Sequence, residues 1–139
     1  MVPDGSGGMF AVWEDYRGGT GRIYAQRLNA AGVPQWTANG IPFDLSRPYG
    51  QTGPVAVPDK VGGVIAAWIE YTGSNEVIRA QRFNASGAFL WSSIVCSTPG
   101  LRRYMSIVSD GSNPITIGSP GGAVIAWNDD RYGSSVNSD

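Results

Sequence analysis

Gly62-Gly63-Val64-Ile65-Ala66-Ala67-Trp68 decides the fold, because its pattern of two glycines, a short apolar run and a tryptophan occurs three times. Gly7-Gly8 leads to Trp13 in the same way, and Gly121-Gly122 leads to Trp127. Each run is apolar at successive positions, so we expect strands that are buried on both faces between two layers. Internal repetition of this kind indicates an architecture built from similar stacked units.

The repeat extends beyond these runs. At the same offset of 55 residues that separates Trp13 from Trp68, Ala25-Gln26-Arg27 returns as Ala80-Gln81-Arg82, Asn29-Ala30-Ala31-Gly32 as Asn84-Ala85-Ser86-Gly87, and Trp36 as Trp91. An insertion at residues 113–118 lengthens the third offset. We therefore expect repeat 1 at residues 1–57, repeat 2 at 58–108 and a partial repeat 3 at 109–139, together forming one domain or a fragment of one.

Each full repeat is expected to hold four short antiparallel strands joined by tight turns, because apolar runs alternate with Gly, Pro and Asn signals. The expected strands are 9–13, 22–28, 33–36 and 54–57 in the first repeat and 64–68, 76–83, 89–93 and 104–108 in the second, with 123–127 opening the third. The 20 glycines and 9 prolines agree with an all-β fold.

Composition excludes several classes of function. The chain has no histidine and one cysteine, Cys96, so His-based triads, the usual zinc sites and an intrachain disulfide are excluded. The net charge of −1 and the lack of a basic tract argue against a nucleic-acid partner. No apolar run is long enough to span a membrane, and Met1-Val2-Pro3-Asp4-Gly5 does not resemble the start of a signal peptide.

The motifs resemble a β-propeller-type repeat of large secreted bacterial proteins, which often carry a C-terminal sorting domain. The resemblance is carried by Gly7-Gly8, Trp13-Glu14-Asp15-Tyr16-Arg17, Ala25-Gln26-Arg27-Leu28-Asn29, Gly32 and Trp36. The second repeat departs from it at Glu70 and Thr72. It implies propeller-blade-like sheets and an extracellular or cell-surface location, and it implies no defined catalytic activity.

About two and a quarter blades are present, whereas a closed propeller needs at least four. Blades cover one another's faces, so an incomplete set leaves apolar faces exposed. The chain is therefore expected either to self-associate into an oligomer-completed propeller or to belong to a larger repeat protein. Closure of two sheets on each other as a sandwich is a further arrangement.

The pattern Trp-x-acid-x-Arg supplies most of the candidate ligand-binding residues. These candidates are Asp15, Arg17, Tyr24, Glu70, Asp129 and Arg131. Residues two apart share a face of a strand, so we interpret the pattern first as an ion pair at a strand end, with its tryptophan packed between sheets. Gln26-Arg27 and Gln81-Arg82 are expected to bond backbone groups of a neighbouring blade, although polar groups beside Tyr24 also suit a glycan.

Other chemistry is less favoured. Calcium is the one cofactor that the acidic turns at residues 4–7, 110–112 and 128–130 suggest, although Asp-Gly pairs also have a direct turn explanation. Paired carboxylates, Glu14 with Asp15 or Glu70 with Glu76, would be needed for glycoside hydrolysis, and we expect no enzyme. The sequence favours a non-catalytic extracellular module for binding or assembly. The alternatives are a carbohydrate-binding or hydrolase-like fragment and a fibre-forming protein joined through edge strands.

Overall fold

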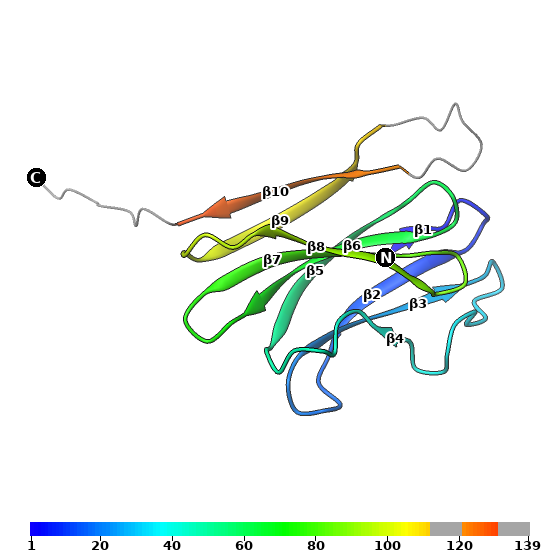
Figure 1. Ribbon diagram of the computed structural model, residues 1–139. Helices are drawn as coiled ribbons and strands as arrows, with labels where there is room; N and C mark the ends of the chain where they lie inside the picture. Colours follow the sequence, from blue (N-terminus) through cyan, green and yellow to red (C-terminus); the bar gives the residue numbers. More distant parts are fainter. Residues whose placement is uncertain (112–120, 131–139) are drawn as a thin grey trace, which may run out of the picture.

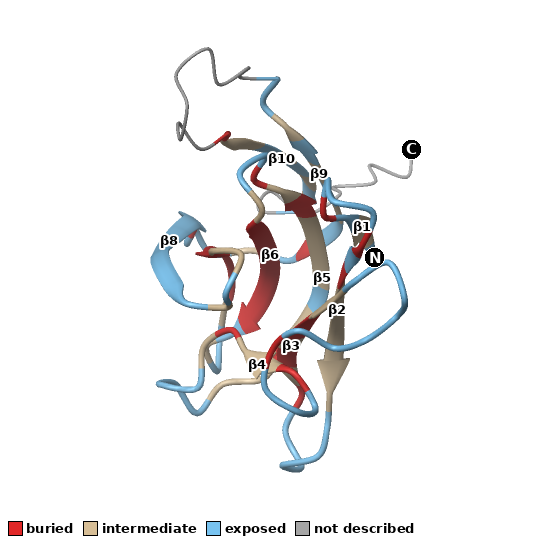
Figure 2. Cartoon of the chain, turned by 90° about the vertical axis from the view of Figure 1, so that its right-hand side faces the viewer, coloured by how far each residue is buried: buried red, intermediate tan, exposed pale blue. Residues whose placement is uncertain are grey.

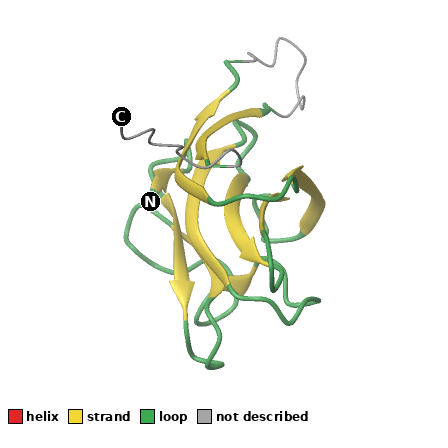
Figure 3. Ribbon diagram, turned by 90° about the vertical axis from the view of Figure 1, so that its left-hand side faces the viewer, coloured by secondary structure: helices red, strands yellow, loops and turns green. Residues whose placement is uncertain are grey.

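The computed structural model describes residues 1–111 and 121–130, and these contain strands and no helix (Figures 1 and 3). The strands are β1 (Val2–Pro3), β2 (Met9–Asp15), β3 (Arg22–Leu28), β4 (Ile41–Pro42), β5 (Gln51–Pro58), β6 (Val64–Tyr71), β7 (Glu76–Phe83), β8 (Phe89–Cys96), β9 (Arg102–Ser109) and β10 (Ala123–Asp129). The expected all-β class is confirmed for this part of the chain. It contains no helix long and apolar enough to cross a membrane.

The strands form three antiparallel sheets in chain order. The first sheet has the order β1-β2-β3-β4, the second β5-β6-β7-β8, and the third pairs β9 with β10 (Figure 1). Within the described residues none of the sheets closes on itself. The main core lies between the first two sheets, where Phe10, Ile23 and Trp36 of the first meet Trp68 and Phe83 of the second.

The sheets divide the chain at points that differ from the expected ones. Residues 54–57, expected as the last strand of the first unit, lie in β5 and pair with β6, with Val57 opposite Ile65. Residues 104–108 likewise lie in β9 and pair with β10. The expected grouping of these strands is wrong, because the turn after β5 closes a hairpin directly into β6 (Asp59 N donates to Gly63 O, 3.0 Å). Each sheet therefore starts with the strand that precedes the Gly-Gly pair.

The first sheet also lacks its expected strand at residues 33–36. These residues make one isolated bridge, Leu28 with Pro34, and the place beside β3 is taken by the two residues of β4. Pro34 has no N–H to donate to a ladder, which accounts for the difference. In the second sheet the corresponding strand, expected at 89–93, is confirmed as β8.

Burial on both faces is confirmed for one of the three apolar runs. Every residue of β6 from Val64 to Glu70 is buried, because the first sheet covers one face and the third sheet lies over the other (Figure 2). In β10 the expectation is wrong, since Val124 and Ala126 are exposed on the face away from the second sheet. The strand β10 of the third sheet is therefore less buried than β6 of the second sheet.

The second glycine of each pair is required by a close approach of chains. A Cβ at Gly8 would collide with the carbonyl oxygen of Leu28, and a Cβ at Gly63 would collide with that of Phe83 and with the Asp59 carboxylate. At Gly122 the obstacle is the Asp110 carboxylate. At Gly8 and Gly63 the absence of a Cβ thus lets the turn lie against the neighbouring strand.

We predict that Gly63→Ala lowers the free energy of unfolding by about 1–3 kcal/mol, because the added methyl group must displace backbone. Urea denaturation monitored by tryptophan fluorescence measures it. The matched control is Gly18→Ala, whose Cβ meets nothing within 4 Å. Equal effects of the two substitutions would contradict this explanation of the repeat.

Candidate functional site

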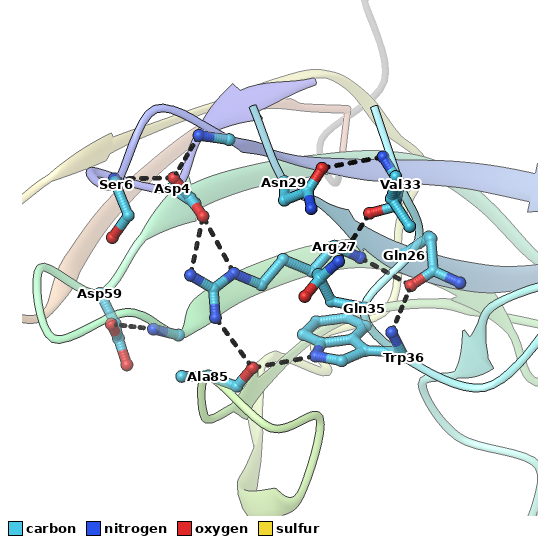
Figure 4. A network of polar contacts seen from close by, with 12 residues as sticks. Asp4, Ser6, Gln26, Arg27, Asn29, Val33, Gln35, Trp36, Asp59 and Ala85 are labelled. Atoms are coloured by element: carbon cyan, nitrogen blue, oxygen red, sulfur yellow. Dashed lines mark hydrogen bonds and ion pairs between the residues drawn. The ribbon is translucent and has the colours of Figure 1, made fainter. Parts of the chain in front are cut away.

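An aspartate holds the turn at the start of each full unit and binds an arginine of β3 or β7. Asp4 Oδ1 accepts the backbone N–H groups of Ser6 (2.7 Å) and Gly8 (2.9 Å), and Asp4 Oδ2 accepts Nε (2.9 Å) and Nη2 (2.8 Å) of Arg27 (Figure 4). Hydrogen bonds from the Ser6 N–H and the Arg27 guanidinium lower the pKa of Asp4. The turn and the arginine are therefore fixed by one carboxylate.

The second unit repeats this arrangement in a more buried setting. Asp59 Oδ1 accepts the N–H groups of Val61 (2.9 Å) and Gly63 (2.6 Å), and its Oδ2 accepts Nε (2.8 Å) and Nη2 (2.6 Å) of Arg82. Asp59 is completely buried. In the third unit Asp110 Oδ2 accepts the N–H of Gly122 (3.0 Å). In all three units an aspartate at the corresponding position thus accepts the N–H of the second glycine of the pair.

One backbone carbonyl of the second sheet accepts two donors from the first unit. The Ala85 oxygen, in the turn between β7 and β8, accepts Nη1 of Arg27 (3.2 Å) and the indole Nε1 of Trp36 (3.1 Å) (Figure 4). The Trp36 ring packs between Phe10 and Phe83, at centroid distances of 5.5 and 6.3 Å. The expectation that the repeated arginine reaches a neighbouring sheet is confirmed for Arg27.

Two further details refine this contact. Gln26 bonds within its own unit, since its side chain accepts the Trp36 N–H (2.9 Å) and donates to the Thr37 carbonyl (3.0 Å), so the inter-sheet role expected for it is wrong. Gly87 lies against the Trp36 indole, where a Cβ would come within 3.1 Å. The turn thus fits closely on Trp36.

The same residue types recur on the second sheet with a different environment. Trp91 lies opposite Arg82 in the ladder between β7 and β8, and it is 38% exposed, whereas Trp36 is 8% exposed. A cavity of about 270 Å³ lies beside it. We call its lining the Trp91 face: Ile65, Ala80, Trp91, Ser93 and Val95 of the second sheet with Ala123 and Ile125 of β10. Figure 2 shows β8 exposed along its length.

Three of the residues proposed from the sequence lie together at one end of the first sheet. Arg17 donates from Nε to Asp15 Oδ1 (2.8 Å), and its guanidinium lies 4.4 Å from the centre of the Tyr24 ring. Trp13 Nε1 also donates to Asp15 (2.9 Å). Bonds from the Arg17 side chain, the Arg17 N–H and Trp13 lower the pKa of Asp15. The groups satisfy one another, as the interpretation of a strand-end ion pair predicts.

Two residues of the second unit that differ from those of the first unit bind each other. Glu70 stands in the place of Asp15 and Arg79 in the place of Tyr24, and these two form a buried ion pair (Nε to Oε1, 2.7 Å). Trp68 Nε1, in the place of Trp13 Nε1, has no hydrogen-bond partner among the described residues. The longer carboxylate therefore binds across to β7 instead of back to its tryptophan.

The remaining proposed residues lie elsewhere. Asp129 accepts Trp127 Nε1 (3.4 Å) in the third sheet, and Arg131 lies outside the described residues. Glu70 and Glu76, considered as a catalytic pair, lie on opposite faces of the second sheet, since Glu70 is opposite Val77 and Glu76 opposite Tyr71. This geometry does not place the two carboxyls across a common substrate.

Glu14 and Asp15, the other carboxylate pair, are adjacent residues of β2 and therefore point to opposite faces. Thr52 Oγ1 (2.7 Å) and the Tyr16 hydroxyl donate to Glu14. No group of three acidic, His or Cys residues suited to a metal occurs in residues 1–111 and 121–130. Cys96 is buried, and its thiol accepts a hydrogen bond from Nη2 of Arg102 (3.1 Å).

Comparison with protein-family models, curated proteins and solved structures gives no significant match. The functional argument therefore depends on the geometry of the chain itself.

We predict different effects of one substitution at the two repeated tryptophans. Trp36→Phe should lower the free energy of unfolding by about 1–3 kcal/mol, because it removes a buried donor to the Ala85 carbonyl. Trp91→Phe should change it by no more than about 0.5 kcal/mol, as exposed substitutions usually do. Thermal or urea denaturation of both variants at a concentration where the chain is monomeric measures the difference. Equal losses would contradict the assignment of different environments.

We also predict that stability falls on acidification. The pKa values of Asp4 and Asp15 are lowered from 3.8 in the folded chain, so the unfolded chain binds more protons as the pH falls. The stability that these carboxylates contribute is complete above about pH 5 and is lost as the pH falls through their lowered pKa values. Asp4→Asn should make the dependence of unfolding free energy on pH shallower. An unchanged slope would show that the bonds to Asp4 do not contribute.

Proposed function

We propose that the chain is a non-catalytic, β-propeller-like repeat module whose function is to assemble with further units of the same kind. The single observation that supports this most strongly is the contrast between Trp36, buried under the turn of the next sheet, and Trp91, which is exposed. The two tryptophans occupy equivalent positions 55 residues apart. The resemblance of the repeat to secreted bacterial proteins supports an extracellular setting for this assembly.

The exposed apolar side chains near Trp91 support the same proposal. Val95 of β8 is 36% exposed and lines the same cavity as Trp91, and Phe89, Leu90 and Ile94 of the same strand are also exposed. Contiguous exposed apolar residues mark interaction surfaces more often than free surface. A repeat unit is stabilised by burying such a face on its neighbour, which makes another unit the natural partner.

Carbohydrate binding is the second candidate. A hollow of about 330 Å³ at one end of the second sheet is lined by residues that include Tyr71, Asn75, Glu76 and Asp130. An aromatic ring beside amide and carboxylate groups is a combination suited to a sugar. Glu76 already accepts the Arg102 N–H and Nη1 of Arg103 (3.2 Å), which favours a binding role over proton transfer. Loss of glycan binding on Tyr71→Ala would support this candidate.

We predict that the chain self-associates and that Trp91→Ser shifts it to monomer. Sedimentation velocity from about 1 to 100 µM, where many specific protein complexes dissociate, measures the shift. Leu45→Ser is the control, because Leu45 is similarly exposed but lies in a loop of the first unit. A monomer at all concentrations would contradict assembly in trans, and association unaffected by Trp91→Ser would place the contact elsewhere.

A further inference from the structure

We infer that the Trp91 face and the outer edge of β10 form a binding site for one β-hairpin of the repeat's own type, with the sequence Ala-Gln-Arg-x-Asn-Ala-x-Gly. This inference rests on the proposed function and deepens it by naming the ligand and its register. The chain itself contains the complex that serves as the template: the hairpin of β7 and β8, seated on the first sheet.

The edge of β10 matches the edge to which β7 is bound. β10 corresponds to β6, and β6 pairs on one side with β5 and on the other with β7. In the described part of the chain β10 pairs with β9 alone. Within the second sheet Val64 lies opposite Phe83 and Trp68 opposite Arg79. A hairpin added at this edge would place its Phe83 equivalent opposite Ala123 and its Arg79 equivalent opposite Trp127.

The cavity at the Trp91 face lies where the apolar residue of the hairpin belongs. In the template, Phe83 projects from β7 onto the first sheet and packs against Trp36 and Phe43. The cavity is lined by Ala123 and Ile125 from β10 and by Trp91 from β8. An apolar side chain opposite Ala123 would therefore enter it and cover Trp91, as Phe83 covers Trp36.

The two donors to the turn have counterparts at the corresponding positions of the second unit. The Ala85 carbonyl binds Arg27 Nη1 and Trp36 Nε1 in the template. The corresponding donors are Arg82 and Trp91, and Arg82 is oriented by Asp59 through the same two nitrogens, Nε and Nη2, as Arg27 is by Asp4. The second residue of the turn would therefore be bound through its backbone carbonyl oxygen. A residue with a side chain as small as alanine can make this contact.

The site should prefer a strand with the sequence Ala-Gln-Arg over other strands because of the arginine. In both full units this arginine binds the aspartate of the preceding turn, Asp4 or Asp59. Asp110 accepts the N–H of Gly122, as Asp4 accepts that of Gly8 and Asp59 that of Gly63. A hairpin arginine in the Arg82 position would lie against the Asp110 carboxylate, giving the site charge complementarity as well as an apolar cavity.

The test uses the full chain labelled with ¹⁵N and a synthetic peptide of residues 76–88, which supplies the first strand and the turn of the hairpin and contains no tryptophan. We expect saturable shifts of the Trp91 indole N–H and of the amides of β10, with contacts between the peptide Phe83 ring and the Ala123 methyl group. The peptide should also compete with any self-association of the chain. The matched control peptide carries Phe83→Ser and should bind at least about tenfold more weakly.

A chain variant separates the turn contact from simple apolar adhesion. Trp91→Phe keeps an aromatic ring but removes the indole donor, and we expect it to weaken peptide binding about fivefold, the equivalent of one hydrogen bond. Absence of saturable shifts up to millimolar peptide, or shifts confined to the edges of β4 or β8, would overturn the inference. Equal binding of the two peptides would overturn it as well.

The outcomes also distinguish this inference from the proposed function. If the chain self-associates and the peptide neither binds nor competes, the hairpin site is wrong while assembly stands. If the chain stays monomeric and the peptide binds in the stated register, the hairpin site stands and assembly between whole chains is wrong.

Discussion

The structure depends on a carboxylate that joins the turn before β6 to an arginine of β7. Asp59 is completely buried and binds its own turn through Oδ1 and Arg82 of β7 through Oδ2. Loss of one partner of such a buried ion pair typically costs about 3–5 kcal/mol, because the other charge is left without compensation. The close approach that Gly63 permits is what brings the turn and the arginine to the same aspartate. The aspartate, glycine and arginine are therefore one structural unit, repeated at Asp4, Gly8 and Arg27.

This unit also orients the contact between sheets. Arg27 is held by Asp4 through two nitrogens, and its third, Nη1, donates to the Ala85 carbonyl beside the Trp36 indole. The ion pair with Asp4 within the first unit thereby orients Nη1 of Arg27 toward the second sheet. This order of dependence explains how a short repeat can specify stacking: each unit builds the surface on which the turn of the following unit lies.

Much of the fold was predictable from the sequence, and the errors have physical causes. The constant offset indicated repeated β units and located most strands, but a periodic sequence does not show where one sheet ends and the next begins. The strand expected at residues 54–57 therefore belongs to the second sheet and not to the first. Pro34 lacks the N–H that a strand at residues 33–36 would donate to its neighbour. The constant offset between the repeats does not predict this difference. Local spacing does not predict the pairing of Asp59 with Arg82, because the residues lie 23 positions apart, although both recur at the same offset as Trp13 and Trp68.

The central claim is that the Trp91 face is an uncovered copy of the interface that buries Trp36. Hydroxyl-radical footprinting with mass spectrometry measures the exposure of each tryptophan separately. We expect Trp36 to be protected at every protein concentration. Trp91 should react readily in dilute solution and become protected as the concentration rises or as the peptide of residues 76–88 is added. Trp91 that remains equally reactive in the associated or peptide-saturated chain would contradict the account.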